Sequence, residues 1–254
     1  MRIIARMNVG GPAVQVSGLM RGIDSTEFDQ RLYTGFCTEE EADYLDSVAT
    51  DVKAIRIEGL GRRVSLRGDF RAFLSLVKAI QEFKPHIIHT HTAKAGTLGR
   101  IASLVSMQKS IRVHTFHGHL LNGYFGSFKK TLVVTTERLL ALVTHQLLAV
   151  GEKVRQDLLE AGIGKKETFG LMPPGLSIAG LPPSYESQEF FGLNRNHLQC
   201  GIIGRVTRIK RLDRFLDVVE ISKKRGLDLD FFIAGDGELL DICRERIATK
   251  NLPV

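Results

Sequence analysis

Short runs of apolar, often β-branched residues alternate with longer amphipathic segments along the first two thirds of the chain. The apolar runs predict strands, at residues 2–7, 27–35, 52–57, 86–89, 111–116 and 146–150. The amphipathic segments predict helices, at residues 12–22, 39–49, 70–83, 95–106, 128–143 and 152–161. Because the strands are apolar on both faces, this rhythm is typical of a parallel sheet between two layers of helices, in a doubly wound α/β domain.

The helix that ends near Phe83 has the clearest amphipathic pattern. Asp69 is a suitable N-cap residue for it, and Pro85 prevents it from continuing. We expect one apolar stripe of this helix to face the core, formed by Phe70, Phe73, Leu74, Val77 and Ile80.

A proline-rich segment interrupts the alternation. The sequence PPGLSIAGLPPS holds four of the seven prolines and follows a short strand-like run at 169–172. Beyond it the alternation resumes, with strands at 199–203 and 230–234 and helices at 211–224 and 238–249. We therefore expect a first domain at 1–175, a linker at 176–196 and a partial second domain at 197–254. Two strands leave an open sheet edge, so we expect this second domain to be truncated.

Composition sets the broad class of protein. With 43% hydrophobic and 25% charged residues, the chain is neither disordered nor fibrous. No apolar run approaches the roughly 20 residues of a membrane helix, and the first residues resemble a strand more than a secretory signal. The three cysteines, Cys37, Cys200 and Cys243, lack metal-site spacing. A reducing, cytoplasmic setting, which includes the inner face of the membrane, is therefore expected.

The net charge of +7 is concentrated in one segment. Residues 83–136 contain seven basic residues, no acidic residue and six of the eight histidines. A local positive field of this kind attracts phosphates, nucleic acid or an anionic membrane surface. A basic surface that arose by chance is the alternative.

Candidate chemistry lies where the predicted strands of the first domain end. Gly10 and Gly11 form the first strand-to-helix turn, where backbone N–H groups can approach an anion. The sequences HTHTAKAG, which contains His91 and Lys94, and HTFHGH, which contains His117, follow neighbouring strands. We expect the two clusters to meet, because ligands bind at the carboxyl edge of such sheets. A zinc site and purely structural histidines are the alternatives.

Two turns of the second half add basic and acidic groups. GRVTRIKR places Arg205 and Lys210 five residues apart, a spacing that allows them to hold a diphosphate from two sides. AGDGE, with Gly235, Asp236 and Gly237, predicts a tight turn into a helix. A basic helix start and a plain turn are the respective alternatives.

In this order, NVGGPA, HTHTAKAGTLGR, HTFHGH, GRVTRIKRLD and AGDGEL resemble the motifs of GT-B glycosyltransferases of the family-4 type. The resemblance covers nearly the whole chain. It implies two Rossmann-like domains, of which the second is incomplete here. It also implies transfer of a sugar from a nucleotide-diphosphate sugar, with retention of configuration and without a cofactor or bound metal.

The resemblance further assigns roles to individual residues. Gly10, Gly11, Arg205 and Lys210 match positions that bind the donor diphosphate, and His117 matches the catalytic-site histidine facing the transferred sugar. The remaining matches are positions near the nucleotide, Gly235, Asp236 and Gly237. His91, Lys94 and His119 are expected to line the acceptor side of the cleft.

The implied partners are a nucleotide sugar and an acceptor sugar or lipid-linked acceptor, with peripheral membrane contact permitted and nucleic acid not expected. The family's Glu-x7-Glu motif has no counterpart, because the chain ends before it. Glu152 and Glu160 have its spacing but lie on a first-domain helix. A non-catalytic protein that binds sugar nucleotides and a basic nucleic-acid-binding protein therefore remain alternatives. The second fits poorly with the absence of tryptophan and of any nucleic-acid-binding module.

Overall fold

A computed structural model describes residues 1–118, 127–175, 186, 192 and 197–254. The chain divides into two compact units, Met1–Ser177 and Ile178–Val254. Both units combine parallel strands with helices, so the predicted α/β class is confirmed. The predicted linker at 176–196 lies almost entirely outside the described residues.

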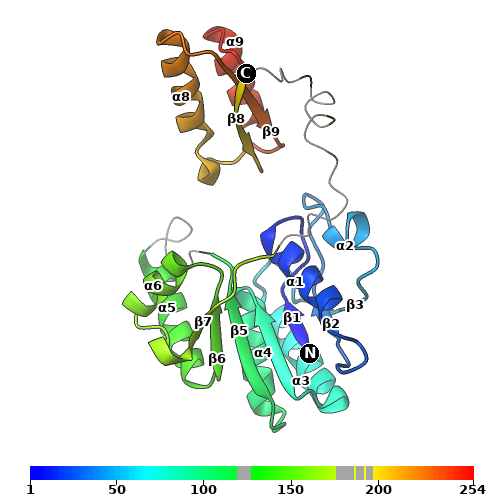
Figure 1. The fold of residues 1–254 in the computed structure, drawn as a ribbon. Coiled ribbons are helices and arrows are strands. Elements are labelled where there is room, and N and C mark those ends of the chain that lie inside the picture. The colour runs from blue at the N-terminus through cyan, green and yellow to red at the C-terminus, as the bar shows by residue number, and fades with distance from the viewer. Residues whose placement is uncertain (119–126, 176–185, 187–191, 193–196) are drawn as a thin grey trace. The chain divides into compact units, whose positions relative to one another are not determined.

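Within the described residues, the first unit has a seven-stranded sheet in which all neighbouring strands are parallel (Figure 1). The strand order is β3-β2-β1-β4-β5-β6-β7. The strands are β1 (Arg2–Ile4), β2 (Leu32–Thr34), β3 (Ala54–Arg56), β4 (Ile87–His91), β5 (Ile111–Phe116), β6 (Gln146–Ala149) and β7 (Phe169–Leu171). The order changes direction between β1 and β4, which is where doubly wound sheets bind their ligands.

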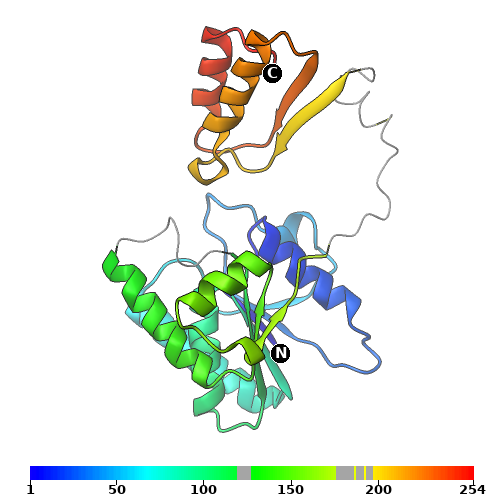
Figure 2. The same ribbon diagram turned by 60° about the vertical axis from the view of Figure 1, so that its left-hand side comes forward.

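Helices connect these strands and cover both faces of the sheet (Figure 2). They are α1 (Gly11–Gly22), α2 (Tyr44–Ser47), α3 (Leu66–Phe83), α4 (Ala93–Val105), α5 (Ser127–Leu142) and α6 (Glu152–Glu160), with a 3₁₀ turn, η1, at Lys166–Thr168. Alternate residues of β1 separate the two faces. Ile3 packs with Leu76 of α3 and Ala102 of α4, whereas Ile4 packs with Val16 of α1. A strand buried on both sides in this way explains its continuous apolar sequence.

The acidic segment 39–49 forms less helix than the sequence predicts, because only the four residues of α2 are helical. Its carboxylates contact arginines of neighbouring elements instead. Glu41 forms an ion pair with Arg6 (2.7 Å), and Asp43 forms one with Arg56 (2.8 Å). These contacts fix the segment as a loop at the carboxyl edge of the sheet.

The start of α3 also differs from the prediction. Ser65 caps the helix by accepting a hydrogen bond from the Gly68 N–H (3.3 Å), and Asp69 lies one turn inside it. At the other end, Lys84 adopts a left-handed conformation (φ 49°) directly before Pro85. The expected stop is thus confirmed, whereas Asp69 as the N-cap is wrong.

The buried side of α3 is only partly the one that the sequence predicts. Ile80 is buried and Phe73 and Val77 are half-buried, but Phe70 and Leu74 are 61% and 49% exposed. The buried line instead includes small Ala72, which lets the helix approach α4 closely. Two large apolar side chains are therefore left on the outer surface.

The second unit has a sheet of two parallel strands within the described residues, β8 (Leu198–Ile203) and β9 (Leu229–Ala234). A 3₁₀ turn, η2 (Arg208–Lys210), and the helices α8 (Leu212–Lys224) and α9 (Leu240–Thr249) complete it. Its small core includes Leu216 and Val219 of α8, Phe231 of β9 and Cys243 of α9. These bounds agree with the predicted strands and helices to within about two residues.

One charged pair lies fully inside the first unit. Arg100 of α4 donates two hydrogen bonds to the carboxylate of Glu137 on α5 (2.7 and 2.9 Å) and one to the Gly96 carbonyl (2.8 Å). The two side chains are 0% and 3% exposed. One of the seven basic residues of the segment 83–136 is therefore neutralised within the core.

In the described part of the chain, no helix is both long and apolar enough to cross a membrane.

We expect loss of one member of this pair to destabilise the first unit strongly. Arg100→Met or Glu137→Leu leaves a buried charge without its partner and should lower the free energy of unfolding by about 3–5 kcal/mol. The double variant removes both charges and should recover most of that loss. Urea unfolding measures the three values. Arg21→Ala, which removes the exposed ion pair with Asp51, is the control and should cost no more than about 1 kcal/mol. A double variant that is as unstable as the worse single variant would contradict this account.

Candidate functional site

The carboxyl ends of β1, β4 and β5 meet at one edge of the sheet. Ile4 lies beside His91, and His91 lies beside Thr115 in the strand register. The backbone of Ala5 donates a hydrogen bond to the Thr92 hydroxyl (3.3 Å) directly beyond the strands. The loop that leads from β1 to Gly10 and Gly11 therefore begins next to both histidine clusters.

Two histidines from neighbouring strands contact each other at this edge. His91 Nδ1 and His117 Nε2 lie 2.9 Å apart, within hydrogen-bonding distance. The His89 ring packs against that of His91, with centroids 4.1 Å apart, and its Nε2 lies 2.7 Å from the Thr115 hydroxyl. The expected meeting of the two clusters is thus present in the structure.

A fourth imidazole, that of His114, lies on the opposite face of the sheet, because its register neighbour Thr90 alternates with His89 and His91 along β4. His114 is buried, and its Nδ1 lies 2.8 Å from the Thr90 hydroxyl. A side chain at Gly96 would meet this ring, because an added Cβ would lie 2.5 Å from His114 Cε1. The glycine therefore allows α4 to pack directly over the imidazole.

Burial keeps these imidazoles uncharged. Desolvation lowers the pKa of His117 to about 4 from the ordinary 6.5. The pKa of His89 is lowered to about 3, mainly by desolvation and further by nearby Arg2 and His117. The pKa values of His91 and His114 are lowered well below 6.5, again mainly by desolvation. Near neutral pH each ring therefore offers one donor and one acceptor, and contributes no positive charge to the segment 83–136.

The contact between His91 and His117 involves one shared proton. Because both rings are neutral, one nitrogen donates and the other accepts, and the choice fixes the tautomer of both rings. The remaining nitrogen of His91, Nε2, is buried and has no partner among the described residues. His119 lies outside the described residues.

A metal site is the alternative reading of such a cluster. Among the described residues, no group of three histidine, cysteine or acidic side chains has the arrangement needed to hold a metal ion. The rings instead use their nitrogens on threonine hydroxyls and on each other. Transfer without a metal stays a prediction.

Space remains open at the glycine turn, which lies at the same carboxyl edge of the sheet as the histidines. Gly11 is the first residue of α1, and Pro12 follows it at the first helical turn. A Cβ added at Gly11 would meet no protein atom within 4 Å, and one at Gly10 would meet none closer than 3.9 Å. Packing within the protein therefore does not require glycine at position 11, whereas the backbone conformation of Gly10 (φ 159°) itself favours glycine. A ligand can approach the backbone at both positions.

Lys94 has a different environment from the one expected. Its ammonium group donates to the carbonyls of Gly59 (2.6 Å) and Arg63 (2.5 Å) and forms an ion pair with Asp69 (2.6 Å). These contacts attach the loop before α3 to the start of α4. They favour a structural role for Lys94, and its place on the acceptor side stays a prediction.

Backbone strain at the end of β4 is a feature that the sequence analysis missed. Thr92 has φ 67° and ψ 155°, a conformation that β-branched residues rarely adopt. Such geometry costs on the order of 1–3 kcal/mol and persists only where surrounding contacts hold it, here with help from the hydrogen bond from Ala5. The unusual conformation of Thr92 turns the backbone from the end of β4 at His91 into α4. No pattern in the sequence signals it.

In the second unit, the two turns after β8 and β9 pack backbone against backbone. The Gly204 N–H donates to the Ala234 carbonyl (2.9 Å), and the Val206 N–H donates to the Asp236 carbonyl (2.8 Å). A Cβ at Gly235 would lie 1.9 Å from the Gly204 carbonyl oxygen, so only glycine fits there. Tight packing, in addition to any ligand, thus explains the glycines of AGDGE.

The basic pair follows the same edge of this smaller sheet. Arg205 and Lys210 are both exposed, on either side of Val206, which is buried in the core. Lys210 ends the 3₁₀ turn η2, and α8 begins only at Leu212. The alternative of a basic helix start is not observed, because a 3₁₀ turn and the left-handed Arg211 (φ 53°) separate the pair from the helix, and the diphosphate role of the pair stays a prediction. The side chains remain free to turn toward an anion.

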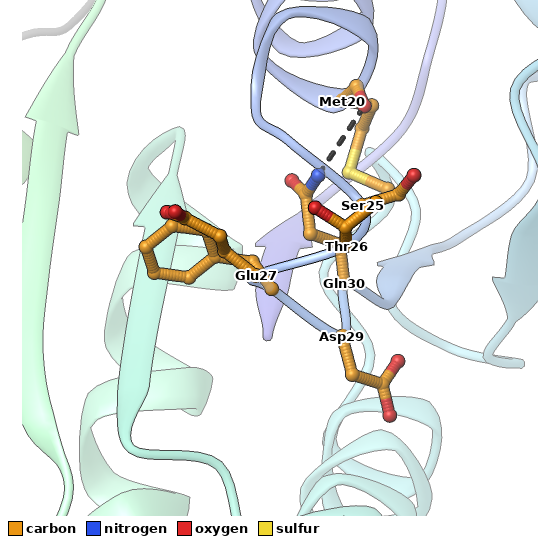
Figure 3. A pocket seen from close by; sticks show the side chains of 7 residues that line it. Met20, Ser25, Thr26, Glu27, Asp29 and Gln30 are labelled. Atoms are coloured by element: carbon orange, nitrogen blue, oxygen red, sulfur yellow. Dashed lines mark hydrogen bonds between the residues drawn. The ribbon is translucent and has the colours of Figure 1, made fainter.

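A surface hollow of about 550 Å³ lies at the opposite, amino-terminal edge of the large sheet (Figure 3). It is formed by the segment before β2, and the Gln30 amide donates to the Met20 carbonyl at its side (3.4 Å). Glu27 and Asp29 give it an acidic wall. Such a wall repels phosphate, so this hollow does not suit the anionic ligand expected from the sequence.

The lowered pKa values predict acid sensitivity of the first unit. Between 6.5 and about 4 the unfolded chain takes up protons on these histidines and the folded chain does not, so the free energy of unfolding falls as the pH falls through this window. His117→Asn removes one such group and should flatten the dependence between about pH 7 and about pH 4.5, measured by urea unfolding. The exposed His86→Asn is the matched control. An identical slope in the native chain and His117→Asn would contradict the buried, neutral state.

Curated relatives resemble this chain over part of their length. An Escherichia coli UDP-Gal:alpha-D-GlcNAc-diphosphoundecaprenol alpha-1,3-galactosyltransferase is 27% identical over 205 residues, which are 78% of this chain and 52% of the relative. CapM, a capsular polysaccharide biosynthesis glycosyltransferase of Staphylococcus aureus, is 21% identical over 70% of this chain and 48% of the relative. The chain thus spans about half the length of these relatives.

Solved structures and a family model complete the comparison. Anabaena HepE, crystallised with UDP and glucose, superposes with a TM-score of 0.72 at 15% identity, over 98% of this chain and 66% of that chain. This likeness concerns the fold, and it confirms the GT-B prediction. The family model for the glycosyl transferase 4-like domain matches residues 10–175, which include the glycine turn and both histidine clusters. The chain therefore belongs to the glycosyl transferase 4-like family.

Proposed function

We propose that this chain takes part in sugar transfer from a nucleotide-diphosphate sugar to an acceptor sugar or lipid-linked acceptor, in polysaccharide or glycolipid synthesis. The observation that carries the proposal is that the neutral His91–His117 pair and the open turn at Gly10 and Gly11 share one edge of the sheet, in a member of this family. The acceptor in the name of the E. coli relative is diphosphoundecaprenol-linked, and the HepE crystal contained UDP and glucose. Both relatives fit a donor and an acceptor of these classes.

In the proposed reaction, the acceptor oxygen forms a bond to the anomeric carbon while the bond from that carbon to the diphosphate breaks. The electron pair of the broken bond remains on the diphosphate, and the proton of the acceptor hydroxyl moves to the same leaving phosphate oxygen. Positive charge develops at the sugar, as in glycoside hydrolysis. In this scheme the acceptor attacks from the same face of the sugar that the diphosphate leaves. We therefore assign retention of the anomeric configuration to the reaction.

His117 suits a positioning and hydrogen-bonding role in this scheme. A histidine with a pKa of about 4 is a weak base at neutral pH, so it is poorly suited to remove the acceptor proton. A neutral ring can still donate or accept one hydrogen bond from a sugar hydroxyl, and its contact with His91 fixes its orientation. No cofactor enters the scheme.

Arg205 and Lys210 supply the charge that the leaving diphosphate requires. The guanidinium can bind two phosphate oxygens at once, and the ammonium group acts as a point charge. Two cations at this position stabilise the negative charge that develops on the phosphate. The neighbouring turn at Gly235, Asp236 and Gly237 is held against the β8 turn and is proposed to lie near the nucleotide.

We expect the basic pair to determine nucleotide binding. Calorimetric titration with uridine and guanosine diphosphates should show binding to the native chain, and Arg205→Ala or Lys210→Ala should weaken it about tenfold or more. Arg225→Ala removes an exposed arginine of the same unit and is the matched control. Equal affinities for all four proteins would remove the pair from the site.

The glycine turn yields a separate test in the first unit. Gly11→Ala places a methyl group in open space and raises helix propensity, so the melting temperature should stay the same or rise. The same methyl group should obstruct a ligand that contacts the backbone, so sugar transfer from UDP-sugars, or their binding by calorimetry, should weaken. Gly18→Ala, on the same helix and equally open, is the control and should leave binding unchanged. A Gly11→Ala variant with native binding would place the ligand elsewhere.

A further inference from the structure

The outer face of α3 carries large apolar side chains that no part of the first unit covers among the described residues. Leu66, Phe70 and Leu74 are 91%, 61% and 49% exposed. They lie four residues apart, so they form one stripe along the helix, next to its buried side. Val64, in the loop just before the helix, is 84% exposed. Exposed apolar surface of this extent on one helix end usually marks an interaction site.

Arginines lie beside this stripe, Arg67 and Arg71 one turn apart on the helix and Arg63 in the loop before it, and together they are called the arginine row. Arg63, Arg67 and Arg71 are exposed, and none of the three has an acidic partner among the described residues. The two acidic residues of the helix itself are engaged elsewhere. Asp69 pairs with Lys94, and Glu82 pairs with Lys78 at the far end of the helix. The stripe and this arginine row together form an amphipathic outer surface with an excess of positive charge.

This surface adjoins the edge of the sheet that carries the histidine pair. The Lys94 ammonium group bonds to the Arg63 carbonyl and to Asp69, and Lys94 follows His91 by three residues. The start of α3 is thereby held next to the carboxyl end of β4. A partner bound at Leu66 and Arg67 would lie beside the candidate site.

We propose that the start of α3, with the stripe Leu66–Phe70–Leu74 and the row Arg63–Arg67–Arg71, is a docking surface for an anionic phospholipid membrane. The apolar side chains enter the boundary between headgroups and acyl chains, and the guanidinium groups contact lipid phosphates at its surface. Charge complementarity selects this occupant. A second copy meeting this face across a two-fold axis would bring the arginine rows together, which is unfavourable.

The docking surface goes beyond the proposed function. Membrane docking itself does not depend on sugar transfer, whereas its use in presenting a lipid-linked acceptor to His117 rests on the proposed function. The experiment therefore measures binding to lipid without nucleotide or acceptor. If the titrations show no nucleotide binding, the result of the lipid-binding experiment is unaffected.

Co-sedimentation of the chain with sucrose-loaded vesicles tests the proposal. The chain should bind vesicles of phosphatidylcholine mixed with phosphatidylglycerol, and bind weakly to phosphatidylcholine alone. Arg67→Ala with Arg71→Ala should weaken binding about fivefold for each charge removed, and raised salt should weaken it further. Leu66→Ser with Phe70→Ser should weaken binding about tenfold or more, because two exposed apolar groups no longer enter the bilayer.

Matched controls distinguish binding through this surface from nonspecific binding by exposed apolar residues and from an effect of the net charge alone. Leu139→Ser with Leu142→Ser replaces two leucines of α5 that are 62% and 79% exposed. Lys109→Ala with Lys166→Ala removes the same charge from exposed positions elsewhere on the unit. Both control pairs should bind the mixed vesicles as the native chain does, and circular dichroism should show that all variants are folded.

Three outcomes would overturn the proposal. The first is equal binding to both kinds of vesicle. The second is weakening by the control pairs as large as that by the α3 pairs. The third is a native dimer in sedimentation equilibrium that Phe70→Ser dissociates, which would make the face a contact between copies. Weakening by both α3 pairs alone, in a monomeric chain, supports membrane docking.

Discussion

Three imidazoles can pack together at one edge of a parallel sheet only if they remain uncharged, and the candidate site depends on this constraint. The His91 ring packs against those of His89 and His117, and the buried His114 lies on the other face of the sheet. Protonation of any ring would bury a charge next to other imidazoles with no carboxylate beside it. The threonine hydroxyls, the missing side chain at Gly96 and the parallel register all serve to satisfy and enclose neutral rings. The histidines consequently offer directed hydrogen-bonding groups without charge. The positive charge that an anionic ligand requires must come from other side chains.

The positive charge of the chain is therefore distributed differently from its appearance in the sequence. The segment 83–136 looks strongly basic, yet Arg100 is neutralised by Glu137 and Lys94 by Asp69. Free guanidinium groups are found instead along α3, outside that segment. Local sequence charge gives the number of basic groups, but only the tertiary contacts tell which of them face solvent.

The sheet and the meeting of the histidine clusters could be predicted from the sequence because both depend on periodicity and on strand ends. The predicted strand at 111–116 matches β5, and the parallel order follows from the βα alternation. The short α2, Ser65 as the N-cap and the exposure of Phe70 could not be predicted in this way. The first and the last depend on residues distant in sequence, namely the arginines that bind Glu41 and Asp43 and the α4 helix that selects the buried side of α3. The Ser65 cap is local, but Asp69, the competing candidate, is bound by the distant Lys94. The strain at Thr92 likewise depends on a contact from β1.

The central pairing of the sheet joins strands that are far apart along the chain. The hydrogen bond from Ala5 to Thr92 connects residues separated by 87 positions, while β1 and β2 pair across a much shorter interval. Pairings of such high contact order form late, because the loss of chain entropy precedes the gain from the contacts. During synthesis, one edge of β1 therefore stays open until β4 has left the ribosome, and the His91–His117 contact must wait for β5 as well. For that interval the nascent chain exposes an apolar strand edge of the kind that chaperones protect from aggregation.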